Sequence, residues 1–282
     1  MKRAIGIAAV VLAGTITGAS AEELLARGEY LVNNVAACGN CHTPQTPNGP
    51  DTSLTMAGSF VGGEEGVFKA FAPNITPDKK TGIGNWTDAE ISLAIREGKR
   101  PDGTIIGPPM PISLYRGLSD TDLKAMVVYL RTVTPVENEV PKSTYYIPLP
   151  PAYGPPVGEV ADMPRDDKVA YGAYLAGPVA HCMECHTTFV KGRPDMENRL
   201  GAGGNSFKGP WGVSVSANIT PHEDGIAKYS DKELAMIIRH GVRPDGTHLM
   251  PPMGFFYYAG MSDGDVGAII AYLRQLKPLA SK

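Results

Sequence analysis

Hydrophobic residues recur at spacings of three and four along several stretches of the chain, and this periodicity predicts amphipathic helices. Two of these helices open with a capping box, one at Thr87–Glu90 and one at Ser230–Glu233. Two later helices are expected to begin after Ser119 and Ser262, which are good N-cap residues. The apolar positions of the four helices are Ile91, Ala94, Ile95, Leu123, Met126, Val127, Leu130, Leu234, Ile237, Ile238, Val266, Ile269, Ile270 and Leu273.

A further short helix is predicted near the start of the chain, with Leu24, Leu25, Leu31 and Val32 on its apolar side. The alternation of apolar and polar residues that is typical of strands is scarce, and Gly/Pro-rich loops connect the predicted helices. The pattern therefore predicts an all-α fold.

The same signals occur twice, because residues 27–133 align with residues 171–276 at an offset of 144 that becomes 143 by Gly82. Self-similarity over this length indicates two folding units of one type. The matched segments are Gly28-x-Tyr30-Leu31 with Gly172-x-Tyr174-Leu175, Asn74-Ile75-Thr76-Pro77 with Asn218-Ile219-Thr220-Pro221, Arg100-Pro101-Asp102-Gly103-Thr104 with Arg243-Pro244-Asp245-Gly246-Thr247, and Pro108-Pro109-Met110 with Pro251-Pro252-Met253.

We therefore predict two domains, residues 22–134 and residues 166–282, joined by a linker at residues 135–165. The linker holds eight prolines, so it is expected to be extended and semi-rigid. It should limit how freely the two domains move relative to each other.

The first residues are typical of a secretory signal. Lys2 and Arg3 precede a short apolar stretch, and Ala19-Ser20-Ala21 fits a small-residue cleavage site. The apolar stretch is shorter than the ~20 residues that a membrane-spanning helix needs. We expect residues 1–21 to be removed on export to the periplasm.

Charge argues against nucleic acid as a partner. The chain has 26 basic and 29 acidic side chains, and loss of Lys2 and Arg3 changes the balance to 24 against 29, or −5. A nucleic-acid-binding domain would carry a basic patch.

All four cysteines lie in two copies of Cys-x-x-Cys-His, which are Cys38, Cys41 and His42 and then Cys182, Cys185 and His186. This motif attaches c-type haem through two thioethers, with the histidine as proximal iron ligand. Cysteines at i and i+3 share a helix face, so both sulfurs can reach one edge of a porphyrin. The sequence predicts two covalently bound haem c groups.

Other uses of Cys-x-x-Cys are a structural zinc site, a thioredoxin-like redox pair and a pair of disulfides. None of them explains why a histidine follows immediately in both copies. Haem attachment is therefore the favoured interpretation.

Methionine as the sixth iron ligand closes a haem site and raises its reduction potential. The repeat predicts Met110 and Met253 as these ligands, 68 and 67 residues after their histidines. Each follows two prolines, which stiffen the loop. Met250 is a rival to Met253, but its counterpart in the first repeat is Gly107.

Arg100 and Arg243 also match in the repeat. A guanidinium fork suits a carboxylate, so each is a candidate partner of a haem propionate. A plain surface ion pair is an equally good interpretation of both residues.

The haem motifs, the Asn-Ile-Thr-Pro segments, the Arg-Pro-Asp-Gly turns and the Pro-Pro-Met loops resemble class I cytochrome c domains. They are most similar to those in the multihaem cytochrome subunits of bacterial membrane-associated dehydrogenases, such as alcohol and gluconate dehydrogenases. Those subunits usually have three haem domains, whereas this chain has two haem motifs.

The resemblance implies a periplasmic electron carrier that takes electrons from a dehydrogenase and passes them to another cytochrome or a terminal oxidase. No segment after the predicted signal reaches the ~20 apolar residues that a membrane-spanning helix needs, so we expect no transmembrane segment in this chain, and any membrane association would be through a partner. The alternative is an enzyme, either a dihaem peroxidase or a sulfur-compound oxidoreductase. A peroxidase would need one methionine to leave its iron. A sulfur enzyme that uses cysteine as a distal ligand is disfavoured, because all four cysteines lie in the haem motifs.

Overall fold

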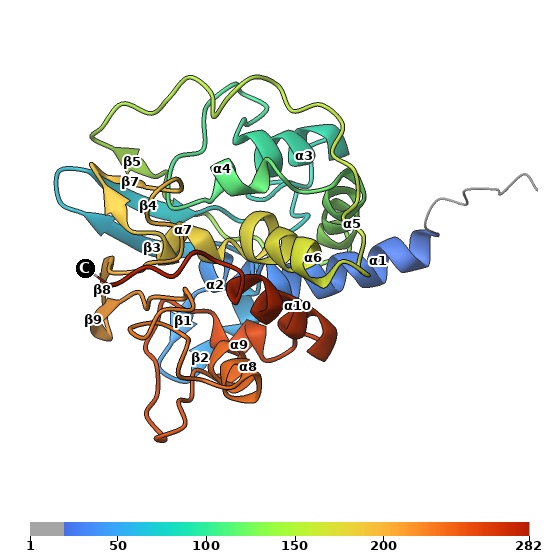
Figure 1. Cartoon of the computed structure of the whole chain (residues 1–282). Coiled ribbons are helices and arrows are strands. Elements are labelled where there is room, and N and C mark those ends of the chain that lie inside the picture. The colour runs from blue at the N-terminus through green and yellow to red at the C-terminus, as the bar shows by residue number, and fades with distance from the viewer. Residues whose placement is uncertain (1–19, 282) are drawn as a thin grey trace, which may run out of the picture.

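The computed structural model describes residues 20–281 (Figure 1). Residues 1–19 of the predicted signal lie outside the described part. Ser20 and Ala21, the last two residues of the predicted signal, belong to the described part. Ser20 caps helix α1 (Ala21–Tyr30), and the Ser20 hydroxyl accepts a hydrogen bond from the Glu23 N–H at 3.2 Å. Helix α1 therefore begins at Ala21, the last residue of the predicted signal.

The described chain contains ten α-helices, two π-helical turns and one 3₁₀ turn. The later helices of the first half are α2 (Gly39–His42), α3 (Asp88–Glu97), α4 (Ile112–Tyr115) and α5 (Asp120–Leu130). Those of the second half are α6 (Lys168–Tyr174), α7 (Cys182–His186), α8 (Asp231–His240), α9 (Phe255–Tyr258) and α10 (Asp263–Leu273). The short turns are η1 (Leu31–Val35), η2 (Thr52–Leu54) and η3 (Leu175–Val179).

The predicted helix starts are confirmed. Thr87 and Ser230 form complete capping boxes with Glu90 and Glu233 at the starts of α3 and α8. The hydroxyls of Ser119 and Ser262 accept from N–H groups in the first turns of α5 and α10.

Nine short strands also lie in the described chain, so the prediction of an all-α fold is wrong and the fold is mixed α/β. They form one three-stranded sheet and three two-stranded hairpins, all antiparallel. The strands are β1 (Gln45–Thr46), β2 (Gly49–Pro50), β3 (Ser59–Glu64), β4 (Phe68–Ala72), β5 (Thr144–Tyr145), β6 (Phe189–Val190), β7 (Arg193–Pro194), β8 (Ser206–Gly209) and β9 (Gly212–Val215).

The strands escaped prediction because they are short and lie mostly on the surface. Strand β9, for example, exposes Val213 and Val215, which are 53% and 61% accessible. A strand without a buried face has no period-two burial pattern, and such a pattern is the main sequence signal of a sheet.

Two close helix crossings build the core, α1 against α5 and α6 against α10 (Figure 1). Each crossing needs a glycine. A Cβ atom at Gly28 would lie 1.9 Å from the Ala125 carbonyl oxygen, and one at Gly172 would lie 1.9 Å from that of Ala268. These glycines match in the repeat, so the two helix pairs approach in the same way.

The two halves of the chain share one hydrophobic core. Turn η1 of the first half contacts α9 of the second, and η3 of the second contacts α4 of the first. Each half therefore places the segment before its haem motif against the short helix that follows the other half's methionine loop.

The proline-rich segment 135–165 runs along the outside of the first half, over α3 and α4 (Figure 1). Strand β5 within it adds to the edge of β4, pairing Tyr145 with Phe68. Further along, the Asp120 N–H at the start of α5 donates to the Val160 carbonyl at 2.9 Å. The segment is thus extended, as predicted, and is held along much of its length.

Within residues 20–281, none of the helices combines the length and the apolar character that crossing a bilayer requires.

Candidate functional site

Each Cys-x-x-Cys-His motif forms a single helical turn that follows a sharp bend. Ala37 and His181 occupy matched positions directly before the motifs, and both have positive φ angles, 49° and 44°. Non-glycine residues rarely adopt this conformation, and where they do the surrounding structure has to hold them there. The bends lie between η1 and α2 and between η3 and α7.

The two histidines are oriented in the same way. Nδ1 of His42 lies 2.8 Å from the Pro73 carbonyl oxygen, and Nδ1 of His186 lies 2.7 Å from that of Ala217. A carbonyl only accepts, so Nδ1 carries the proton and Nε2 keeps its lone pair. Burial also lowers the pKa of both imidazoles, which favours the neutral form that binds metal.

The repeated Asn-Ile-Thr-Pro segments hold these carbonyls in place. The Asn74 side-chain oxygen accepts from the Thr76 N–H at 2.9 Å and from the Thr76 hydroxyl at 2.8 Å. Asn218 and Thr220 form the same pair of bonds at 2.9 and 2.7 Å. The sequence shows that these segments are repeated but does not show what they do. Sequence reasoning therefore missed Pro73 and Ala217, whose carbonyls orient the two histidines.

The cysteines favour haem attachment over the alternatives. All four are unbridged, and no group of three His, Cys, Asp or Glu side chains within residues 20–281 is arranged to hold a metal ion. A redox-active pair needs a lowered thiol pKa. Here burial raises the pKa of Cys38 to about 12 and that of Cys182 to about 11.

Met110 and Met253 lie at matched places, each just before a short helix, α4 or α9. Both side chains are half-buried and pack against the shared core, as Cys38 and Cys182 do. Met250, the rival of Met253, is instead 45% exposed. Thioether sulfurs that pack against the core are available as iron ligands.

Arg100 and Arg243 are held by their own turns. Their Nη1 atoms donate to the hydroxyls of Thr104 and Thr247 at 3.3 and 3.2 Å. Neither forms an ion pair with a carboxylate of residues 20–281, and both are half-buried. Each guanidinium therefore keeps donors for an external carboxylate.

The two motifs also contact the opposite halves. Asn40, inside the first motif, donates to the Pro252 carbonyl at 2.9 Å, directly before Met253. His181, directly before the second motif, lies edge-on to the buried Tyr115 ring at 5.8 Å between ring centroids. The two candidate sites are thus neighbours across the interface between the halves.

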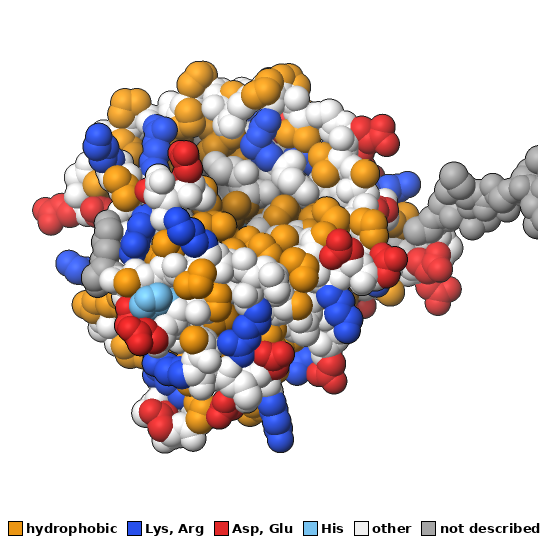
Figure 2. Space-filling view, in the orientation of Figure 1, with side chains coloured by type: hydrophobic (Ala, Val, Ile, Leu, Met, Phe, Trp, Pro, Cys, Tyr) orange, Lys and Arg blue, Asp and Glu red, His pale blue; other side chains and the backbone are white. Residues whose placement is uncertain are grey.

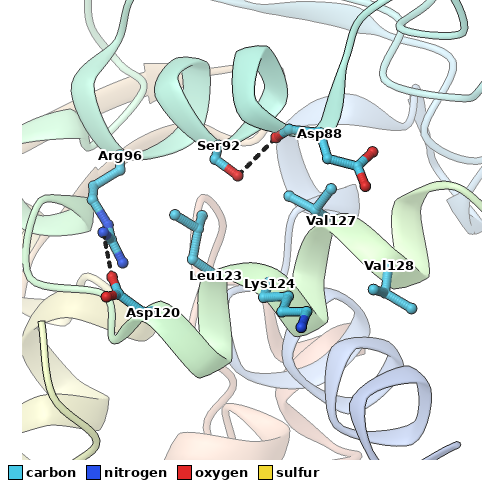
Figure 3. A pocket seen from close by; sticks show the side chains of 8 residues that line it. All are labelled: Asp88, Ser92, Arg96, Asp120, Leu123, Lys124, Val127 and Val128. Atoms are coloured by element: carbon cyan, nitrogen blue, oxygen red, sulfur yellow. Dashed lines mark hydrogen bonds and ion pairs between the residues drawn. The ribbon is translucent and has the colours of Figure 1, made fainter. Parts of the chain in front are cut away.

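A surface groove lies between α3 and α5, and none of the predicted site residues lines it (Figure 3). Two of its charges pair with each other: Arg96 forms an ion pair with Asp120 at 2.6 Å and also donates to the Leu118 carbonyl at 2.7 Å. The groove is therefore a feature of helix packing, separate from the motifs.

The donor set fits haem c, since each motif offers two unbridged thiols and a histidine whose Nε2 is free. Comparison with known proteins agrees. Residues 169–277 match the cytochrome c family model. This part of the chain is therefore similar to cytochrome c domains, which hold haem c covalently.

Known relatives extend the similarity over nearly the whole chain. The fructose dehydrogenase cytochrome subunit of Gluconobacter japonicus is 31% identical over 89% of this chain and 52% of its own length. The cytochrome c subunit of the quinone-dependent alcohol dehydrogenase of Gluconobacter oxydans is 29% identical over 97% of this chain and 59% of its own length. The predicted resemblance to dehydrogenase cytochrome subunits is confirmed.

The chain thus spans a little over half the length of these two dehydrogenase subunits. A protein of similar size also matches. The "Diheme cytochrome c-type" protein of Cereibacter sphaeroides is 27% identical over 89% of this chain and 85% of its own length.

Proposed function

We propose that this protein is a dihaem c-type cytochrome of the periplasm that carries electrons from a dehydrogenase to another cytochrome or a terminal oxidase. The observation that carries the proposal is the matched orientation of His42 and His186 beside two unbridged cysteine pairs. The names of the relatives support a dehydrogenase as the electron donor.

The chain would form two cytochrome domains, residues 22–134 and 166–282, joined by residues 135–165. Cys38 and Cys41 would hold one haem, and Cys182 and Cys185 the other. His42 with Met110, and His186 with Met253, would be the axial ligands, while Arg100 and Arg243 would bind propionates.

Bound haem iron supplies one-electron chemistry by cycling between its ferrous and ferric states. The protein residues do the rest. The Pro73 and Ala217 carbonyls fix the proton on Nδ1 of each histidine, which keeps Nε2 facing away from the carbonyl. The half-buried Met110 and Met253 would hold the sixth position of each bound iron and exclude water and small ligands from it.

Two axial protein ligands at each iron favour transfer of electrons over catalysis, because a peroxidase needs an open or easily opened position. The test is the resting absorption spectrum of the exported protein together with a peroxide-turnover assay using a reduced donor. We expect two low-spin centres, reversible one-electron reduction of each, and no turnover. A high-spin centre with rapid peroxide consumption would favour the dihaem enzyme instead.

A further inference from the structure

The segment that joins the two halves lies over the loop that carries Met110. The Tyr145 hydroxyl donates to the Pro108 carbonyl at 2.9 Å, and the Tyr153 hydroxyl donates to the Ile106 carbonyl at 2.8 Å. Two side chains of one segment thus bind the loop within four residues of the predicted iron ligand.

The loop depends on such outside donors. Pro108 and Pro109 have no N–H groups, so they cannot stabilise the loop through hydrogen bonds donated by their own backbone. The carbonyls that precede Met110 must be satisfied by water or by side chains. Burial raises the pKa of Tyr145 and of Tyr153, so both hydroxyls keep their protons and remain donors at neutral pH.

The tyrosines are themselves held firmly. The Ser143 hydroxyl accepts from the Phe71 N–H at 2.9 Å and donates to its carbonyl at 3.1 Å, next to the pairing of β5 with β4. Beyond Tyr153, Arg116 donates to the Pro155 carbonyl at 2.5 Å, and the Val157 N–H donates to Glu97 at 3.1 Å. The segment is therefore anchored on both sides of the loop.

Gly107 shows how closely the joining segment packs over the loop. A Cβ atom on Gly107 would lie 2.5 Å from the Tyr145 ring and 2.9 Å from the Leu149 side chain, so only glycine fits without a shift. The matched position in the second half is Met250, whose side chain is 45% exposed. Within the described residues, the second loop carries no such cover at this position.

The second loop is held differently. The Pro251 carbonyl accepts from the Ser214 hydroxyl of β9 at 2.7 Å, and the Pro252 carbonyl accepts from Asn40 at 2.9 Å. Both bonds are solvent-exposed, where water competes and a hydrogen bond contributes less.

We propose that Tyr145 and Tyr153 are positioning residues for Met110, so that the first iron keeps its methionine more tightly than the second iron keeps Met253. The inference rests on the proposed function, because it takes Met110 and Met253 as axial ligands. The segment that joins the two halves then also positions a ligand of the first haem iron.

The test uses the full holoprotein with Tyr145→Phe, Tyr153→Phe and the double variant, which remove only the hydroxyls. Imidazole is titrated into the ferric protein, and loss of each iron–methionine bond is followed by absorption and by NMR of the axial methionine methyl groups. Met110→Ala and Met253→Ala assign the two signals.

We expect imidazole to displace Met253 at lower concentration than Met110 in the wild type. Each lost hydroxyl should raise the imidazole affinity of the first iron by roughly fivefold, as expected for one hydrogen bond, without changing the second. Tyr146→Phe is the matched control, because the Tyr146 side chain is 66% exposed and makes no hydrogen bond among residues 20–281. It should leave both affinities unchanged.

Unchanged imidazole affinity in the double variant, or an equal change at both irons, would overturn the proposal. If Met110→Ala leaves both methionine signals intact, the ligand assignment fails as well, so the two failures can be told apart. Should the double variant not accumulate, hydrogen exchange of the wild type decides: residues 103–112 must show higher protection factors than residues 246–255. Equal or lower protection would contradict the proposal.

Discussion

The Tyr30 hydroxyl in the first half of the chain donates to the Asp265 carboxylate in the second half at 2.7 Å. The matched Tyr174 in the second half donates to Asp122 in the first, also at 2.7 Å. The two halves thus exchange equivalent hydrogen bonds at the first turns of α5 and α10. Asp122 has a second partner, since Arg27 binds it at 2.8 Å, whereas Asp265 has no other side-chain donor within residues 20–281.

This difference predicts unequal effects of removing the two hydroxyls. Tyr30→Phe leaves the buried Asp265 without a side-chain donor and should lower the free energy of unfolding by about 2 kcal/mol. Tyr174→Phe should cost about 1 kcal/mol, because Arg27 still binds Asp122. Guanidinium unfolding of both holoprotein variants checks the order, and a larger loss for Tyr174→Phe would contradict it.

Replacing either crossing glycine should weaken the core. Gly28→Ala and Gly172→Ala each drive a methyl group into a helix backbone and should cost about 1–3 kcal/mol of unfolding free energy. Gly267→Ala is the control, since it lies in α10 with no atom within 4 Å of the new Cβ. It should stabilise the protein by about 0.5–1 kcal/mol. Equal effects of Gly172→Ala and Gly267→Ala would show that the crossing is looser than described.

Loss of an axial methionine should appear in the spectrum. Met110→Ala and Met253→Ala are each expected to make one iron high-spin and to lower its reduction potential. Met250→Ala is the matched control, because Met250 is exposed on the same loop as Met253. Optical spectra and redox titration provide the readout. Wild-type spectra from both single variants would rule out the ligand assignment.

The helix caps predict a pH dependence of stability. Hydrogen bonds from Thr87 and Ser230 lower the pKa of Glu90 and of Glu233 in the folded chain. The unfolded chain then binds more protons as the pH falls, so the caps stabilise the fold above the ordinary glutamate pKa of about 4.3 and lose that effect below it.

The Glu90→Gln/Glu233→Gln double variant should therefore show a flatter fall in stability from about pH 5 to pH 3 than the wild type. Glu159→Gln is the control, because Glu159 is exposed and makes no side-chain hydrogen bond within the described chain. Thermal unfolding at each pH gives the comparison. Identical slopes for the double variant and the wild type would argue against the caps as a source of the dependence.

The sequence predicts helices correctly where one buried face gives the apolar residues a regular spacing. The spacing of the apolar residues between Leu123 and Leu130 predicts helix α5, because these residues form the face that packs in the core. The N-cap Ser119 is predicted from its residue type alone. The hairpins were missed for the opposite reason. Strands β8 and β9 have no buried face, so nothing in their apolar pattern distinguishes them from loops.

The candidate site also has parts that the sequence predicts and parts that it does not. Cys38, Cys41 and His42 are predicted from one contiguous motif. The Pro73 carbonyl that orients His42 lies 31 residues away in the sequence, where the only signal is that the neighbouring segment is repeated. The tyrosines over the Met110 loop belong to a proline-rich segment without a counterpart in the repeat. Gly107 stands where the second half has Met250, and its meaning is clear only from the structure, in which the Tyr145 ring covers it.

The central claim is that one chain carries two covalent haems, and counting haems per chain tests it most directly. The intact mass of the exported protein, measured with its pyridine haemochrome absorbance, should give two haems per chain. The Cys182→Ala/Cys185→Ala variant should give one haem, as should Cys38→Ala/Cys41→Ala. A wild-type protein that carries one haem, or none, would contradict the account.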